Sequence, residues 1–111
     1  MNLIKKTLRI YQDCNGREPF SDWIGTLTAG DRARVIVRLD RVETGNPGDH
    51  RSVGEDVYEF RFIFGSGYRV YYGEVDNTLV LLLCGGDKSS QKKDVKKAKA
   101  YWRDYISRRT V

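Results

Sequence analysis

Two arginines and one lysine occupy positions where they could stabilise a phosphate group. Arg61 and Arg69 lie on two consecutive strand-like segments, and Lys88 lies in a short loop directly after the next one. Cations that are fixed in place before a reaction can stabilise the negative charge that develops on a phosphate in the transition state. These residue types therefore favour phosphoryl chemistry or the binding of a polyanion.

The distance between Arg61 and Arg69 depends on the turn that joins their strands. Side chains alternate between the two faces of a sheet, so a slip of one residue moves a side chain to the opposite face. A three-residue loop at 65–67 would pair Arg61 with Tyr71 and make the two arginines diagonal neighbours, within roughly 7 to 8 Å at the backbone. Such a pair repels itself unless an anion, or a carboxylate such as Glu59, lies between its members. The alternative is an exposed polar sheet face that Glu59 balances.

The loop that carries Lys88 could hold phosphate in a second way. It reads Gly-Gly-Asp-Lys-Ser-Ser from position 85 and precedes a segment with a helical pattern. Free backbone N–H groups and the dipole at the start of a helix favour anions. The alternative is that Asp87 and Ser89 act only as turn and capping residues. The loop lacks the spacing of a nucleotide-binding P-loop, and nothing predicts a Mg²⁺ site.

Further basic residues gather on two predicted helices. The chain has 20 Lys and Arg against 15 Asp and Glu, a formal net charge of +5, which favours a polyanionic partner. On a helix such residues could follow a nucleic-acid backbone, or they could form an ordinary solvated face. The candidates for nucleic-acid contact are Arg34, Arg38, Arg41, Lys92, Lys93 and Lys96.

Other kinds of chemistry find little support in the sequence. No His and Cys cluster has the spacing of a zinc site, and the carboxylates are not paired for acid–base work, so we expect neither a metal nor another cofactor. His50 lies in a turn-rich loop, where it could carry protons near neutral pH or be only solvated. Cys14 and Cys84 form no CxxC pair, and no segment resembles a membrane span or a signal peptide. We therefore expect a reduced, cytoplasmic protein without membrane contact.

The elements that must position these residues belong to one expected domain, residues 1–111. A chain of this length can bury one core but not two independent ones. Period-two patterns predict strands, and apolar residues at i, i+3, i+4 and i+7 predict helices. The resulting order is β-α-α-β-β-β-α, an α+β fold with a small, mainly antiparallel sheet. The predicted strands are 3–12, 57–64, 68–75 and 78–84, the helices begin near Pro19, Gly30 and Ser89 or Ser90, and residues 44–51 form a loop.

Apolar patterns also predict which surfaces are buried. Aromatic residues at 58, 60, 62 and 64 place the core on one face of their strand, with Glu59 and Arg61 on the other. Ile36, Leu39 and Val42 form the inward stripe of the middle helix. The segment 78–84 is apolar on both faces, which predicts a strand inside the sheet.

Three short motifs, together with this order of elements, resemble the RelE/ParE toxin superfamily. More narrowly, nearly the whole chain is similar to its HigB-like branch, the addiction module killer proteins. The resemblance implies a small twisted sheet with helices packed on it, and the toxin of a type II toxin–antitoxin pair. The motifs are Tyr58-Glu-Phe-Arg61, Gly67-Tyr68-Arg69-Val-Tyr71 and Gly86-Asp87-Lys88-Ser-Ser-Gln91.

The resemblance also implies an activity and a set of site residues. RelE-like members cleave mRNA on the ribosome without a metal ion, which would make the chain an endoribonuclease, or mRNA interferase. Arg69 matches the family's arginine after Gly-Tyr, Arg61 a basic position on the preceding strand, and Lys88 a basic position after the last strand. Glu59 stands where some members have a lysine, and the lysine-rich final helix offers no match to the tyrosine that some of these nucleases carry there.

The expected reaction is attack by the RNA 2′-hydroxyl on the adjacent phosphate. Arg61, Arg69 and Lys88 would stabilise the developing charge. The attacking hydroxyl needs a proton acceptor, and the candidates are Glu59, Tyr71 and the loop histidine. The six basic helix residues named above would contact RNA.

Two other functions stay open. A ParE-like toxin would bind and poison DNA gyrase without nuclease chemistry, and a non-catalytic module would only hold nucleic acid through salt-dependent phosphate contacts. For a toxin, the resemblance implies a cognate antitoxin, which we expect to carry a helix-turn-helix and to be encoded by the adjacent gene. The mRNA and the ribosome would be the further partners of a nuclease.

Overall fold

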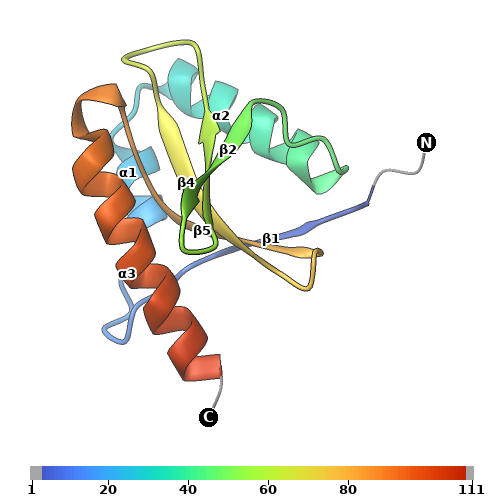
Figure 1. Ribbon diagram of the computed structural model, residues 1–111. Coiled ribbons are helices and arrows are strands. Elements are labelled where there is room, and N and C mark those ends of the chain that lie inside the picture. Colours follow the sequence, from blue (N-terminus) through green and yellow to red (C-terminus); the bar gives the residue numbers. More distant parts are fainter. Residues whose placement is uncertain (1–3, 110–111) are drawn as a thin grey trace.

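A five-stranded sheet runs through the middle of the computed structural model, which describes residues 4–109 (Figure 1). The strand order is β1-β5-β4-β3-β2; β1 pairs parallel to β5, and every other pair is antiparallel. The prediction of an α+β fold with a small, mainly antiparallel sheet is confirmed, and β5 lies inside the sheet as expected. The strands are β1 (Thr7–Ile10), β2 (His50–Gly54), β3 (Val57–Arg61), β4 (Arg69–Val75) and β5 (Leu79–Gly86).

The strand β2 is an addition to the predicted order, which becomes β-α-α-β-β-β-β-α. Its first residues fall in the segment that we expected to be a loop throughout. The strand lies at the edge of the sheet and is largely exposed, so it shows no apolar alternation that would predict it. It joins β3 through Glu55 and Asp56, which both have positive φ, as a tight hairpin turn requires.

The hairpin between β3 and β4 differs from the predicted one. Arg61 lies directly opposite Arg69, so the connection is residues 62–68 rather than a three-residue loop, and the predicted pairing of Arg61 with Tyr71 is wrong. Beyond this pair the backbone N–H of Phe62 still donates to the carbonyl of Tyr68 at 3.0 Å, and the rings of Phe62 and Phe64 pack edge to face, with 5.7 Å between their centroids. Burial of these rings against the helical layer therefore sets the length of the loop.

Helices cover both faces of the sheet. α1 (Pro19–Gly25) and α2 (Ala29–Glu43) lie on one face, and α3 (Gln91–Arg109) lies on the other, after a single 3₁₀ turn, η1 (Lys88–Ser90) (Figure 1). The Thr28 hydroxyl caps α2 by accepting a hydrogen bond from the backbone N–H of Asp31, at 3.3 Å. No helix within residues 4–109 has the length and apolar character to cross a membrane.

Two apolar clusters hold these layers together, so the core is not confined to one sheet face. On the α2 face the buried helix residues are Val35, Leu39 and Val42, whereas Ile36, which we expected to be buried, is 43% exposed. On the opposite face, Trp102 of α3 packs directly on Gly73 of β4. A Cβ atom at Gly73 would lie 2.2 Å from the indole ring, so only glycine allows this close approach.

Candidate functional site

A carboxylate with no exposed surface lies at the centre of the candidate site. Glu59 projects from β3 towards α3, and its Oε1 atom is 2.7 Å from Nε of Arg51 on β2 and 3.8 Å from Nε of Arg69 on β4. The side-chain amide of Gln91, at the start of α3, donates to both carboxylate oxygens at 3.3 and 3.4 Å. Three adjacent strands and one helix therefore meet at this ion.

Arg69 carries hydrogen-bond donors that the protein does not satisfy. Its Nε atom is buried and has no hydrogen-bond partner among residues 4–109, and its Nη1 donates only a long bond of 3.5 Å to the carbonyl of Gly67. The side chain still keeps 13% of its surface exposed. Buried donors without partners are costly and rare in folded proteins, so the Nε of Arg69 is held by the charge of Glu59 at 3.8 Å rather than by a hydrogen bond.

Arg61 is held by a second carboxylate. Its Nε and Nη2 donate to Oδ1 of Asp49 at 3.2 and 2.9 Å, and these bonds hold the pKa of Asp49 below its usual range. Arg61 and Arg69 are direct cross-strand neighbours, where like charges repel. Because Asp49 balances one and Glu59 the other, both arginines can stay together at the same end of the sheet.

Lys88 reaches this end of the sheet through its loop. Its backbone N–H donates to the carbonyl of Ser66 at 3.4 Å, and the Ser66 hydroxyl donates to Asp87 at 2.9 Å. A Cβ atom at Gly67 would touch the Lys88 side chain at 3.4 Å, and the carbonyl of the same glycine accepts the bond from Arg69. Lys88 is exposed. Both Lys88 and Arg69 therefore lie next to Gly67.

The helix start beside Lys88 is not an open anion site. The Asp87 carboxylate accepts from the backbone N–H and the hydroxyl of Ser89, at 2.9 and 2.6 Å, and so caps the turn. These bonds, with one from Ser66, lower the pKa of Asp87. A phosphate therefore finds this position already filled by a carboxylate, and the capping alternative from the sequence is the correct one.

Two of the proposed proton acceptors do not fit that role. Tyr71 has no exposed surface, and its hydroxyl has no hydrogen-bond partner within the described residues. Burial, followed by the charge of Glu59, raises its pKa, so it stays protonated. His50 lies in a separate cavity of about 270 Å³ with Phe60 and Tyr72 of the α2-side cluster, on the sheet face opposite to Glu59.

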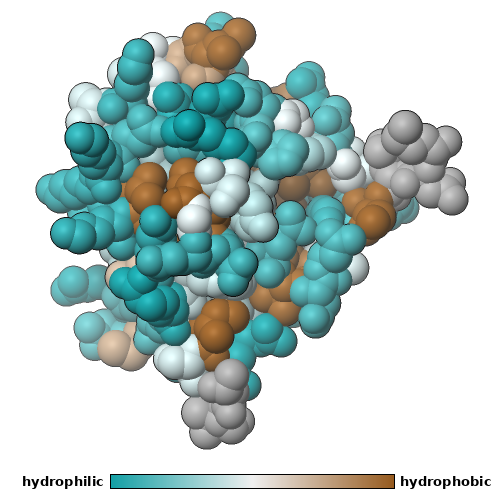
Figure 2. Space-filling model, viewed as in Figure 1, coloured by the Kyte–Doolittle hydropathy of each residue, from teal (hydrophilic) through white to brown (hydrophobic). Residues whose placement is uncertain are grey.

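The six basic helix residues fall into two separate sets. Lys92, Lys93 and Lys96 are exposed on α3, and Lys92 lines a groove of about 480 Å³ between β2 and α3 together with Arg51 and Gln91. Figure 2 shows hydrophilic residues covering the α3 side of the molecule. The arginines of α2 lie on the other side of the sheet. Of the six, only Lys92 lines the groove that Arg51 and Gln91, the partners of Glu59, also line.

Arg51 and Gln91 belong to the site although the sequence analysis did not select them. Arg51 lies on the strand that was expected to be a loop, and no pattern there indicated its direction. Gln91 ends the third motif, and its position directly after the Lys88 loop was a usable signal. In the described part of the chain, no group of three or more His, Cys, Asp or Glu residues could hold a metal ion.

Comparison with known proteins places this arrangement in a family. A family model described as phage derived protein Gp49-like (DUF891) matches residues 22–103, which include every residue of the cluster around Glu59. The chain belongs to the Gp49-like family. An uncharacterized protein of Haemophilus influenzae is 44% identical over 81 residues, which cover 72% of this chain and 82% of that protein.

Membership in the Gp49-like family indicates a general class of function. This is a family of RelE/HigB-like addiction module killer proteins, associated with phage-derived toxins of toxin–antitoxin systems. A toxin of this kind implies an antitoxin partner. In this chain Arg51, Arg61 and Arg69 lie towards the same end of β2, β3 and β4, and Lys88 follows the end of β5 beside Arg69.

Proposed function

We propose that the protein is a ribosome-dependent mRNA endonuclease, the toxin of a type II toxin–antitoxin pair. One observation carries this proposal: the side chain of Arg69 is partly exposed at the end of the sheet where Arg51, Arg61 and the Lys88 loop also lie. A phosphate would contact the exposed part of this guanidinium, because its Nε is buried against Glu59. The positive charge needed to hold it comes from the protein's own guanidinium and ammonium groups.

The reaction that suits this site is an intramolecular transesterification at a phosphate of the RNA. The 2′-oxygen bonds to the adjacent phosphorus while the bond from phosphorus to the 5′-oxygen breaks, which leaves a 2′,3′-cyclic phosphate and a 5′-hydroxyl end. The proton of the 2′-hydroxyl passes to water, and the departing 5′-oxygen takes a proton from solvent. Each well-placed cation accelerates such a step by a factor on the order of 10² to 10³.

Glu59 acts in this proposal as a positioning residue. With no exposed surface it does not reach a substrate, but it holds Arg69 from one side and Arg51 from the other. Arg61 is held less firmly, because its ion pair with Asp49 is exposed and exposed ion pairs contribute little to stability. A phosphate can therefore displace Asp49 from Arg61 at little cost.

The lysines of α3 extend the site along the RNA. Lys92 lines the groove between β2 and α3, and Lys93 and Lys96 are exposed on the same helix. They supply the salt-dependent phosphate contacts that position a strand without reading its sequence.

The test is cleavage of a defined mRNA by the purified protein with and without ribosomes. Expected products are fragments with 2′,3′-cyclic phosphate ends that appear only when translating ribosomes are present. The order of events after induction in cells provides a second measurement, because a nuclease halts translation before any DNA damage response. DNA damage first, with intact mRNA, would refute the nuclease and support a gyrase poison.

A further inference from the structure

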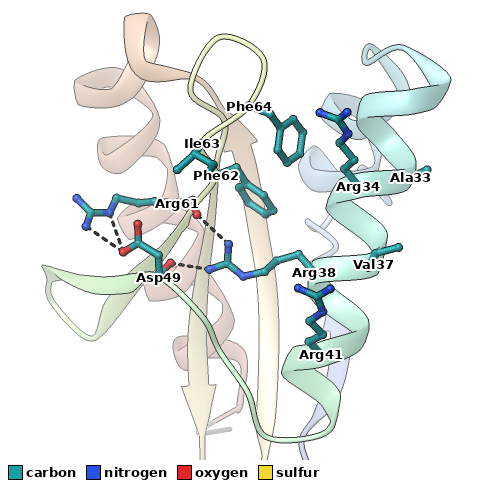
Figure 3. A pocket seen from close by; sticks show the side chains of 10 residues that line it. All are labelled: Ala33, Arg34, Val37, Arg38, Arg41, Asp49, Arg61, Phe62, Ile63 and Phe64. Carbon is teal, nitrogen blue, oxygen red and sulfur yellow. Dashed lines mark hydrogen bonds and ion pairs between the residues drawn. The ribbon is translucent and has the colours of Figure 1, made fainter.

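A groove of about 510 Å³ lies on the opposite side of the sheet from α3. One wall is α2, which contributes Val37 and the three arginines Arg34, Arg38 and Arg41. The other wall is the end of β3 and the loop that follows it, residues 61–64. In Figure 3 the rings of Phe62 and Phe64 point towards α2, and Arg34 and Arg38 reach towards them. The proposed nuclease reaction uses only Arg61, with its partner Asp49, among the residues that line this groove.

The groove exposes aliphatic surface. Ile63 is 100% exposed and Val37 is 50% exposed, both at the groove. Figure 2 shows hydrophobic atoms at the top of the view, over the loop between β3 and β4. Single exposed apolar residues are ordinary, but apolar residues that line one hollow together indicate a surface for a partner.

The charge of the groove is strongly one-sided. Four arginines and one aspartate line it, and the aspartate is already paired with Arg61. Arg34 and Arg41 form no ion pair within residues 4–109. Arg34 lies over the ring of Phe64 with its Cζ 5.2 Å from the centroid, so it covers the aromatic face.

Arg38 fixes the shape of the groove and keeps its charge. Its guanidinium donates to the carbonyls of Pro47, Asp49 and Arg61 at distances of 2.6 to 3.3 Å, and it lies over the ring of Phe62 at 5.0 Å. Carbonyl oxygens satisfy its donors without neutralising it. The arginine that we grouped with nucleic-acid contacts is thus a fixed positive charge in the wall of an apolar groove.

From these observations we infer that the groove is the docking site for an acidic, amphipathic segment of the antitoxin. The inference rests on the proposed function. Apolar side chains of the segment would cover Ile63 and Val37, and its carboxylates would pair with Arg34 and Arg41. An RNA strand fits less well, because base stacking needs open aromatic faces, and here the arginines cover the rings.

Docking here also explains how the antitoxin silences the site. Arg61 and Asp49 form one end of the groove, and their ion pair is exposed. A carboxylate of the docked segment competes with Asp49 for Arg61 and keeps that arginine from the phosphate. The docked partner therefore inhibits cleavage without entering the groove between β2 and α3.

The test is the affinity between the protein and the product of the neighbouring reading frame. The groove variant Val37→Glu/Ile63→Asp adds two acidic residues at exposed positions. A control variant, Ile4→Asp/Ile36→Glu, makes the same exchanges at aliphatic residues that are 50% and 43% exposed outside the groove. We expect the groove variant to bind at least about tenfold more weakly and the control to bind within about threefold of the wild type.

Cleavage without the partner separates the possible outcomes. We expect the groove variant to cleave ribosome-bound mRNA normally and to remain toxic when the neighbouring gene is coexpressed. Equal affinities for the two variants would overturn the inference, and so would lost cleavage with unchanged partner binding, which would make the groove an RNA surface. If the wild type binds the partner but cleaves nothing, the nuclease proposal fails and the docking site stands. If the wild type cleaves mRNA but does not bind the partner, the docking site fails and the nuclease proposal stands.

Discussion

Arg69→Ala removes the side chain on which the proposed mechanism most depends. The substitution deletes a guanidinium whose Nε has no hydrogen-bond partner and lies 3.8 Å from the Glu59 carboxylate. It leaves Arg51 at 2.7 Å from the same carboxylate and Gln91 within hydrogen-bond distance. The buried charge of Glu59 therefore keeps two of its three partners.

These contacts set the expected magnitudes. Loss of one preorganised donor to the reacting phosphate should lower the cleavage rate by a factor on the order of 10² to 10³, which corresponds to about 2.7 to 4 kcal/mol. Stripping a buried ion of all its partners costs about 3 to 5 kcal/mol of stability. Because Glu59 stays paired with Arg51, we expect a smaller loss, about 1 to 2 kcal/mol in the free energy of unfolding.

The assay compares cleavage rate, unfolding and toxicity in one set of variants. Arg9→Ala is the matched control, since it removes the same charge from an exposed position on β1, at the far edge of the sheet. We expect Arg69→Ala to abolish toxicity while antitoxin binding is retained, and Arg9→Ala to behave as the wild type. Cleavage by Arg69→Ala at the wild-type rate would refute the proposed site, whatever its effect on stability.

Three further predictions test other parts of the structure. Tyr71→Phe removes a buried hydroxyl that lies beside Glu59 without a well-formed hydrogen bond, so the free energy of unfolding should change by less than about 1 kcal/mol and cleavage should persist; a large loss of rate would show that the hydroxyl takes part. A hydrogen bond from the buried Tyr11 hydroxyl is the main cause that lowers the pKa of Asp104. The carboxylate therefore contributes fully to stability above pH about 4, and this contribution is lost as the pH falls through the lowered pKa. Urea unfolding should therefore show a smaller loss between pH 7 and pH 3 for Asp104→Asn than for the wild type, and equal losses would contradict this. Gly73→Ala should cost about 1 to 3 kcal/mol by collision with Trp102, whereas Gly30→Ala, with open space in α2, should be neutral or stabilising by up to about 1 kcal/mol in the same thermal melts.

The sequence predicts those helices and strands whose apolar residues recur at a regular spacing. β4, β5, α2 and α3 have apolar residues at regular spacing, and each appears close to its expected place. β2 has no such pattern because an edge strand is exposed on most of its surface. The register of the β3–β4 hairpin was missed for another reason: the turn residues at 65–67 predicted a three-residue loop, whereas the last backbone bond joins Phe62 to Tyr68 and the loop is longer.

The same distinction holds for the site. That Arg61, Arg69 and Lys88 meet at one end of the sheet follows from the order of strands, which the motifs and the turns predict. The burial of Glu59 was not predictable, because its closest partner, Arg51, lies on the strand without a pattern. The sequence suggested Glu59 as a carboxylate between Arg61 and Arg69 or as a proton acceptor, whereas the structure pairs it with Arg51 and Arg69.

The cluster around Glu59 also has a consequence for how the protein is made. Its members come from β2, β3, β4 and the start of α3, and that helix supplies the cover for this face of the sheet. Before α3 has been synthesised and packed on the sheet, the Glu59 carboxylate lacks the amide of Gln91 and the cover of this helix. The proposed nuclease site would therefore be complete only after the last helix has folded.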